Sequence, residues 1–120
     1  MKDITELEHL DEVLEQSTRT PVLVYKHSDM CGTAWHAEGL VNEANEQLAD
    51  DPVEFYKLEV RKARPLSNAF ADKLGVRHES PQALLIVNGE VVWHASHGGI
   101  RTRLIVEAVR ESATGAPSDA

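Results

Sequence analysis

The stretch Pro21-Val22-Leu23-Val24-Tyr25-Lys26-His27-Ser28-Asp29-Met30-Cys31-Gly32-Thr33-Ala34-Trp35 decides how this chain folds. An almost uninterrupted apolar run over residues 21–26 predicts a buried, central strand. Polar residues 27–30 predict a turn, and helical periodicity begins at Gly32. This order places Cys31, the only cysteine, at the start of a helix. The unpaired N–H groups and the dipole of a helix N-terminus favour the thiolate, which is the reactive form of the side chain.

The segments around this stretch predict the element order α-β-α-β-α-β-β-α. The two strands that flank the helix after Cys31 form a parallel βαβ unit with a right-handed crossover. Asn88-Gly89 is a strong hairpin signal, so the last two strands pair antiparallel. Helices are expected over residues 3–17, 32–48, 65–74 and 102–112, and strands over residues 21–26, 53–60, 83–87 and 90–95.

A βαβ half, a connecting helix and a ββα half describe, by analogy, a thioredoxin-like α/β fold with a four-stranded mixed sheet. In that fold the active thiol follows the first strand of the βαβ half, which is the position of Cys31. A cis-proline faces the thiol just before the third strand, and Pro81 stands there in Glu79-Ser80-Pro81-Gln82. We therefore predict a cis bond between Ser80 and Pro81, against the alternative of a trans proline that opens a strand.

Length and composition are those of one domain over residues 1–112, followed by a small polar tail over 113–120 that we expect to be disordered. The formal net charge is −8, from 12 basic and 20 acidic residues, which argues against a nucleic-acid partner. The sequence has no apolar stretch that could span a bilayer and no secretory signal, so we expect a cytoplasmic monomer with no membrane partner. A single cysteine also fits a reducing compartment.

The four residues Cys31-Gly32-Thr33-Ala34 occupy the place of the Cys-x-x-Cys motif of dithiol enzymes. Ala34 replaces the second, resolving cysteine, so a mixed disulfide on Cys31 must be cleared by a thiol from elsewhere. Pro81 is expected to shape a loop whose backbone pairs with an extended substrate, and Thr33 offers a hydroxyl to the thiolate. Cys31 is the expected catalytic residue. The residues expected to bind substrate are Gly32, Thr33, Ser80 and Pro81.

Three long strings carry a resemblance to a known family: Pro21-Val22-Leu23-Val24-Tyr25-Lys26-His27-Ser28, Gly75-Val76-Arg77-His78-Glu79-Ser80-Pro81-Gln82-Ala83-Leu84-Leu85 and Asn88-Gly89-Glu90-Val91-Val92-Trp93-His94-Ala95-Ser96-His97. From about residue 5 to residue 110 the chain resembles the YtxJ-type monothiol bacilliredoxins of the bacillithiol system.

The resemblance implies a thioredoxin-like oxidoreductase of redox homeostasis that removes bacillithiol from S-bacillithiolated proteins through a single cysteine. It implies S-thiolated client proteins as partners, bacillithiol or another low-molecular-weight thiol as co-substrate, and no bound cofactor. The family commonly has Thr-Cys-Pro-Ile-Ser around the thiol, whereas this chain has Met30-Cys31-Gly32-Thr33-Ala34, so only the cysteine carries over.

Two other functions stay open on the sequence alone. Monothiol glutaredoxins with a Cys-Gly-Phe-Ser motif hold an iron–sulfur cluster between two subunits, and Cys31-Gly32 matches the first half of that motif. The other is a non-enzymatic thioredoxin-like interaction module. Among the histidines, His27, His36, His94 and His97 invite a metal site, but no second cysteine completes a zinc set, so no metal is expected.

Several large side chains are expected to have ordinary structural roles. Trp35 and Trp93 are expected to be packing residues and not part of a recognition site. The basic side chains of Lys26, Lys57, Arg61 and Arg64 are expected to be solvated, although a basic group near Cys31 would suit the carboxylates on the malate part of bacillithiol.

Overall fold

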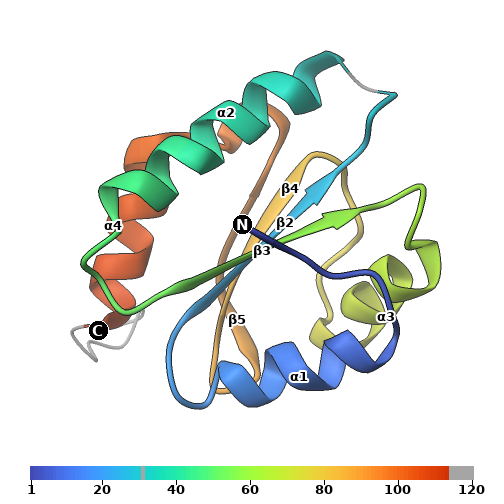
Figure 1. Cartoon of the computed structure of the whole chain (residues 1–120), viewed down its shortest axis with the longest axis horizontal. Helices are drawn as coiled ribbons and strands as arrows, with labels where there is room; N and C mark the ends of the chain where they lie inside the picture. The colour runs from blue at the N-terminus through green and yellow to red at the C-terminus, as the bar shows by residue number, and fades with distance from the viewer. Residues whose placement is uncertain (31, 114–120) are drawn as a thin grey trace.

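The central strand predicted over residues 21–26 is β2, Val22–His27, and it lies in the middle of the sheet (Figure 1). The computed structural model describes residues 1–30 and 32–113. Cys31 and residues 114–120 of the predicted tail therefore lie outside the described residues. The other elements are β1 Lys2–Asp3, α1 Glu8–Gln16, α2 Gly32–Gln47, β3 Glu54–Glu59, α3 Arg64–Leu74, β4 Gln82–Val87, β5 Glu90–Ser96, the 3₁₀ turn η1 His97–Gly99 and α4 Thr102–Ala113.

The sheet has the strand order β1-β3-β2-β4-β5. Strand β2 is parallel to β3 and antiparallel to β4, and β5 is antiparallel to β4, as the βαβ and ββα halves predict. All six residues of β2 are buried because the sheet is covered on both faces. Helices α2 and α4 cover one face, and α1 and α3 cover the other (Figure 1).

Two apolar clusters fill the spaces between the sheet and these helices. Leu23 and Tyr25 of β2 pack on the α2–α4 side, whereas Val22 and Val24 pack on the α1–α3 side. This alternation is the ordinary period of a strand, and it continues through the last two residues of β2. Lys26 therefore points to the α3 side and His27 to the α2 side, which decides what each can contact.

The prediction of a four-stranded sheet was wrong, because a short strand at the N-terminus makes five. Lys2 and Asp3 were expected to precede or begin the first helix, but they lie parallel to β3 opposite Tyr56 and Lys57. Ile4 is buried, and its N–H donates to the Lys57 carbonyl at 2.9 Å. That anchor holds the preceding residues extended along the edge of β3, and a two-residue strand is too short to leave a periodic pattern.

The bond between Ser80 and Pro81 is cis, which confirms the prediction made from the fold analogy. The Asn88-Gly89 hairpin is also present, with positive φ angles of 51° and 77° that suit a tight two-residue turn. Ser17, at the end of α1, holds this turn: its carbonyl accepts the Asn88 N–H at 2.8 Å, and its hydroxyl oxygen accepts the Gly89 N–H at 2.9 Å.

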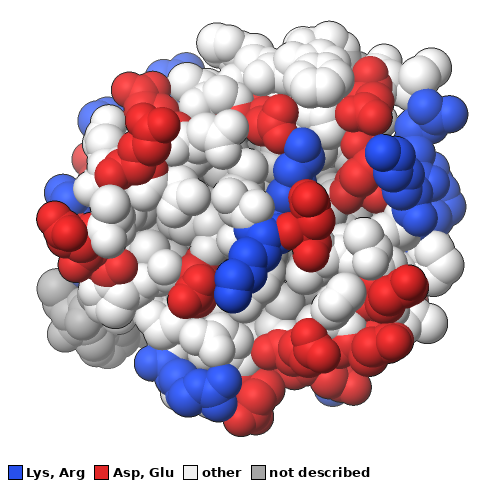
Figure 2. Space-filling view, viewed as in Figure 1, with Lys and Arg blue, Asp and Glu red and all other residues white. Residues whose placement is uncertain are grey.

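The surface carries the acidic excess of the composition. Figure 2 shows acidic side chains gathered over α1 at the lower edge of the view, a small group of basic side chains at the upper right edge, and other basic groups lying among acids. An uninterrupted basic surface suited to a phosphate backbone is not visible on this face. Among the helices of residues 1–30 and 32–113, none has both the length and the apolar character needed to cross a membrane.

Two glycines test how the hairpin and α2 are stabilised. Gly89→Ala should lower the free energy of unfolding by about 1 kcal/mol, because a Cβ is strained at φ +77°. Gly39→Ala, at an exposed position inside α2 with nothing within 4 Å of the new Cβ, should raise it by about 0.5–1 kcal/mol. Urea denaturation measures both variants, and effects of the same sign would contradict this account of the turn.

Candidate functional site

The candidate site lies where β2 ends and α2 begins. His27 is the last residue of β2, and Gly32 is the first residue of α2 and is exposed. The intervening turn includes Asp29 and Met30, and Met30 is 73% exposed. Cys31 directly precedes Gly32 in the sequence and lies outside the described residues. The described part of the candidate site is therefore made of the residues around this position.

A buried hydrogen-bond chain fixes the first turn of α2 to the sheet. The Tyr25 hydroxyl donates to the Ala34 carbonyl at 2.8 Å, and the same oxygen lies 3.0 Å from His27 Nδ1. Ala34 occupies the position of the missing resolving cysteine and is itself fully buried. Tyr25 therefore positions the helix at the point where a dithiol enzyme would have its second sulfur.

Trp35 packs against a neighbouring ring, but it does so at the surface, where it is 55% exposed. Its indole meets the edge of the His27 ring, with centroids 4.8 Å apart and the planes at 76°. His27 is buried between this indole and the tilted Tyr25 ring. Trp35 thus serves as a cover over His27 at the surface of the candidate site, while the hydrophobic stripe of α2 starts at Ala34.

The cis-proline loop reaches the same end of the sheet. Because β4 begins at Gln82 opposite Lys26, Pro81 lies beside the C-terminal end of β2. The His97 N–H donates to the Pro81 carbonyl at 3.1 Å. The Ser80 hydroxyl is buried and has no hydrogen-bond partner among the described residues. The loop is therefore tied to the turn after β5, and Ser80 keeps unused hydrogen-bonding capacity.

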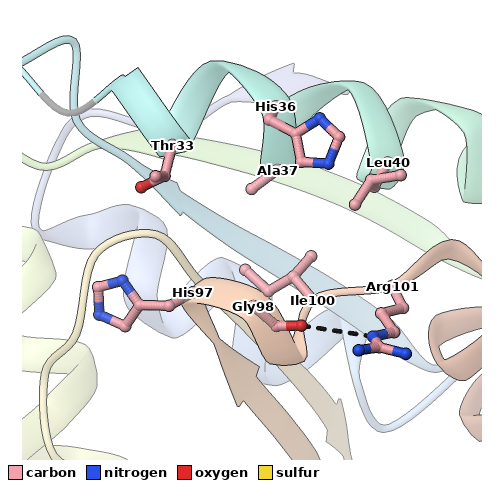
Figure 3. A pocket seen from close by; sticks show the side chains of 8 residues that line it. All are labelled: Thr33, His36, Ala37, Leu40, His97, Gly98, Ile100 and Arg101. Atoms are coloured by element: carbon pink, nitrogen blue, oxygen red, sulfur yellow. Dashed lines mark hydrogen bonds between the residues drawn. The ribbon is translucent and has the colours of Figure 1, made fainter.

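A cavity of about 360 Å³ lies between α2 and η1 (Figure 3). Thr33 projects from α2 and His97 from the opposite wall, and His36 and Arg101 bring two further basic groups to it (Figure 3). Ala37, Leu40 and Ile100 add apolar side chains to the lining. The residues that line the cavity are Thr33, His36, Ala37, Leu40, His97, Gly98, Ile100 and Arg101.

The structure brings together most of the residues that the sequence singled out. Thr33 lines the cavity and Gly32 precedes it on the same helix turn, while Pro81 is one hydrogen bond from His97 on the far wall. Arg101 was not considered from the sequence. The sequence does contain a signal for Arg101: it is a basic residue that follows the Gly98-Gly99 pair, between the last predicted strand and the last predicted helix.

Comparisons with known proteins agree with this geometry. Residues 2–105 match the family model described as monothiol bacilliredoxin BrxC. The chain belongs to the monothiol bacilliredoxin family. The resemblance seen in the sequence is thereby confirmed.

Solved structures place this family member in the thioredoxin fold. A protein with a thioredoxin fold, suggested to be an oxidoreductase, is 33% identical with a TM-score of 0.80, over 89% of this chain and 91% of that one. A mutant thioredoxin from Halobacterium salinarum is 25% identical, with a TM-score of 0.68 over 92% and 88% of the two chains. Fasciola hepatica thioredoxin is similar in fold alone, at 16% identity and a TM-score of 0.72 over 92% and 98%.

Lys26 departs most sharply from expectation, since it is fully buried and not solvated. Its ammonium donates to the Ser67 carbonyl at 3.1 Å and lies 3.3 Å from His78 Nδ1. Burial lowers the pKa of Lys26 to about 8, and no carboxylate among the described residues pairs with its ammonium. Burial, and then the nearby charges of Lys26 and Arg64, also lower the pKa of His78, two residues before Ser80.

Lys26→Met tests the cost of this buried charge. As the pH rises from 8 to 10.5, folded Lys26 loses its proton before the unfolded chain does. The unfolded state then binds more protons, so this group raises the free energy of unfolding across that window, by up to about 3 kcal/mol. Denaturation curves at several pH values should show that the free energy of unfolding rises over this window in the parent protein. This rise should be absent in Lys26→Met.

The matched control is Lys62→Met, which removes an exposed ammonium from the turn after β3. This variant should keep the pH dependence of the parent protein. An unchanged slope in Lys26→Met would show that the Lys26 ammonium stays protonated in the folded protein throughout the window.

Proposed function

We propose that this family member removes bacillithiol from S-bacillithiolated proteins, with Cys31 as its catalytic thiol. The observation that carries the proposal is the basic cavity beside the first turn of α2, since Thr33, His97 and Arg101 share it. Family membership supports thiol–disulfide exchange as the chemistry. The cavity supports a small anionic thiol as the group transferred.

The exchange takes two steps that balance in atoms and electrons. The Cys31 thiolate attacks the bacillithiol sulfur of the client's mixed disulfide, and the client thiolate leaves and takes up a proton. Cys31 then carries bacillithiol. Because Ala34 supplies no second sulfur, a thiolate of free bacillithiol attacks this mixed disulfide, which releases bacillithiol disulfide and restores the Cys31 thiolate. The two electrons that reduce the client come from the two bacillithiol thiols.

The cavity walls suit the polar part of that thiol. Bacillithiol carries carboxylates on its malate part, and the Arg101 guanidinium can hold a carboxylate through two parallel hydrogen bonds. His36 and His97 offer further donors, and all three side chains are exposed, so a ligand can reach them from solvent. The cavity volume of about 360 Å³ falls within the size of small-molecule sites.

The cis-proline loop would hold the client polypeptide. An extended segment can add to a loop or sheet edge by backbone hydrogen bonds, and Ser80 lies directly before Pro81 where such a segment would run. Gly32, with open space where a Cβ would lie, leaves the start of α2 accessible to it. In this proposal Gly32, Thr33, Ser80 and Pro81 contact substrate, as the sequence led us to expect.

The catalytic assignment is tested by Cys31→Ala. Release of bacillithiol from a modified client protein, followed by mass spectrometry, should cease in this variant and should proceed in the parent protein with free bacillithiol present. The parent protein should also be recovered with a bacillithiol mass added at Cys31 when free bacillithiol is withheld. Release that persists in Cys31→Ala would remove the proposed function.

Arg101→Gln tests whether the cavity is the binding site for the bacillithiol group. Loss of a charged hydrogen-bond donor to a carboxylate should raise KM for the bacillithiol-modified client about tenfold and leave kcat nearly unchanged. Arg103→Gln is the matched control, because Arg103 is exposed on α4, pairs with Glu107 at 2.9 Å and does not line this cavity. Equal kinetics in both variants would place the substrate elsewhere.

A further inference from the structure

Three potential metal ligands meet at the C-terminal end of the two central parallel strands. His27 and Glu59 are the last residues of β2 and β3 and lie opposite each other in the parallel register. Asp29 follows two residues after His27, in the turn toward α2. One imidazole nitrogen and one carboxylate oxygen from each acid all lie within 4.8 Å of one another.

The hydrogen bonds of Tyr25 determine which nitrogen of His27 carries the proton. A carbonyl can only accept, so the single hydroxyl proton of Tyr25 goes to Ala34, 2.8 Å away. The Tyr25 oxygen must therefore accept from His27 Nδ1, 3.0 Å away, and Nδ1 carries the hydrogen. In a neutral ring, Nε2 is then left with a lone pair and no hydrogen.

The surroundings of His27 Nε2 favour a bound cation. His27 Nε2 is buried and makes no hydrogen bond among the described residues. Asp29 Oδ1 lies 3.2 Å from it, but without hydrogen-bond alignment. With no hydrogen between them, the nitrogen and the carboxylate oxygen repel each other at this distance, and a positive ion bound to both atoms turns the contact into attraction.

The spacing of these atoms fits a small transition-metal ion. Two ligands at about 2.1 Å from a tetrahedral Zn²⁺ are about 3.4 Å apart, close to the 3.2 Å between His27 Nε2 and Asp29 Oδ1. Glu59 is only partly buried, so a side-chain rotation can bring its carboxylate closer. An imidazole with two carboxylates suits Zn²⁺ or Co²⁺ better than Ca²⁺ or Mg²⁺, which take oxygen ligands.

The structure also holds the imidazole as metal-bound histidines are held. Such histidines commonly donate their other ring N–H to a fixed acceptor, which sets the ring orientation and the basicity of the ligand. Here Tyr25 is that acceptor, and it is itself fixed by Ala34. Asp29 is 46% exposed, so an ion can enter from solvent on its side while Trp35 covers the ring.

We propose that His27, Asp29 and Glu59 bind one divalent transition-metal ion of the Zn²⁺ class, with a solvent molecule completing the coordination. The two carboxylates neutralise the charge of the ion, and three protein ligands leave a position open to exchange. Occupancy would tie the ends of β2 and β3 to the turn that leads into α2. This binding activity is independent of the disulfide chemistry proposed above.

Zinc titration of untagged, chelator-treated protein tests the proposal. Isothermal calorimetry should give one Zn²⁺ per chain, and Co²⁺ should produce the visible d–d absorption of a low-coordinate site. Asp29→Asn and Glu59→Gln should each weaken Zn²⁺ binding at least about tenfold, as expected for the loss of a ligand. Both positions reach solvent, so these variants should fold even if His27→Ala does not.

Two controls separate this site from other ligands. Glu79→Gln alters a carboxylate 3.6 Å from another histidine, His97, and should leave Zn²⁺ affinity unchanged. Cys31→Ser should retain binding of one ion. Loss of binding in Cys31→Ser with no change in Asp29→Asn and Glu59→Gln would assign the ion to the thiol and overturn the proposal.

Nitrogen-15 spectra of the His27 ring provide a further test of whether Nε2 binds the metal ion. Under the proposal Nδ1 carries the hydrogen, and the Nε2 resonance shifts when Zn²⁺ is added. A ring already protonated on both nitrogens, with no response to Zn²⁺, would mean that a proton fills the site, and the proposal would be wrong.

Discussion

The alternation of side chains at the end of the central strand is the constraint on which the rest of this structure depends. Because β2 is buried on both faces, successive residues must go to opposite layers. Tyr25 and His27 enter the α2 side, where they fix the start of the helix, and Lys26 enters the α3 side beside Ser67 and His78. A shift of one residue in register would exchange these environments and dismantle the site.

The local parts of the fold could be predicted because each leaves a signal in a short window. The apolar run of β2 and the Asn88-Gly89 turn were predicted correctly from neighbouring residues, and the cis bond at Pro81 from the analogy to the thioredoxin fold. The strand at Lys2–Asp3 could not be read, since it exists only by pairing with β3. Lys26 was misjudged because charge alone suggests solvent, whereas strand alternation and a helix carbonyl decide its place.

Neither the cavity nor the proposed metal site could be predicted from the sequence, and the physical reason is the same for both. His97 and Arg101 meet α2 only because β5 ends at the same edge of the sheet as β2. Likewise the sequence offers no second cysteine to complete a zinc set, while the parallel register places Glu59 opposite His27 from 32 residues further along the chain. Ligands assembled across strands leave no spacing pattern in the chain.

The attachment of Ser17 to the hairpin lies at the other end of the sheet from all of this chemistry. The Asn88-Gly89 turn and the start of β2 share that end, whereas Pro81, His97 and the start of α2 share the opposite one. Six strand residues separate the two ends, about 20 Å, a distance at which energetic effects of substitutions usually add independently. Stability and chemistry are therefore spatially separable in this protein. Substitutions at the Ser17 end can therefore raise or lower the stability of the fold without changing the end of the sheet where α2 begins.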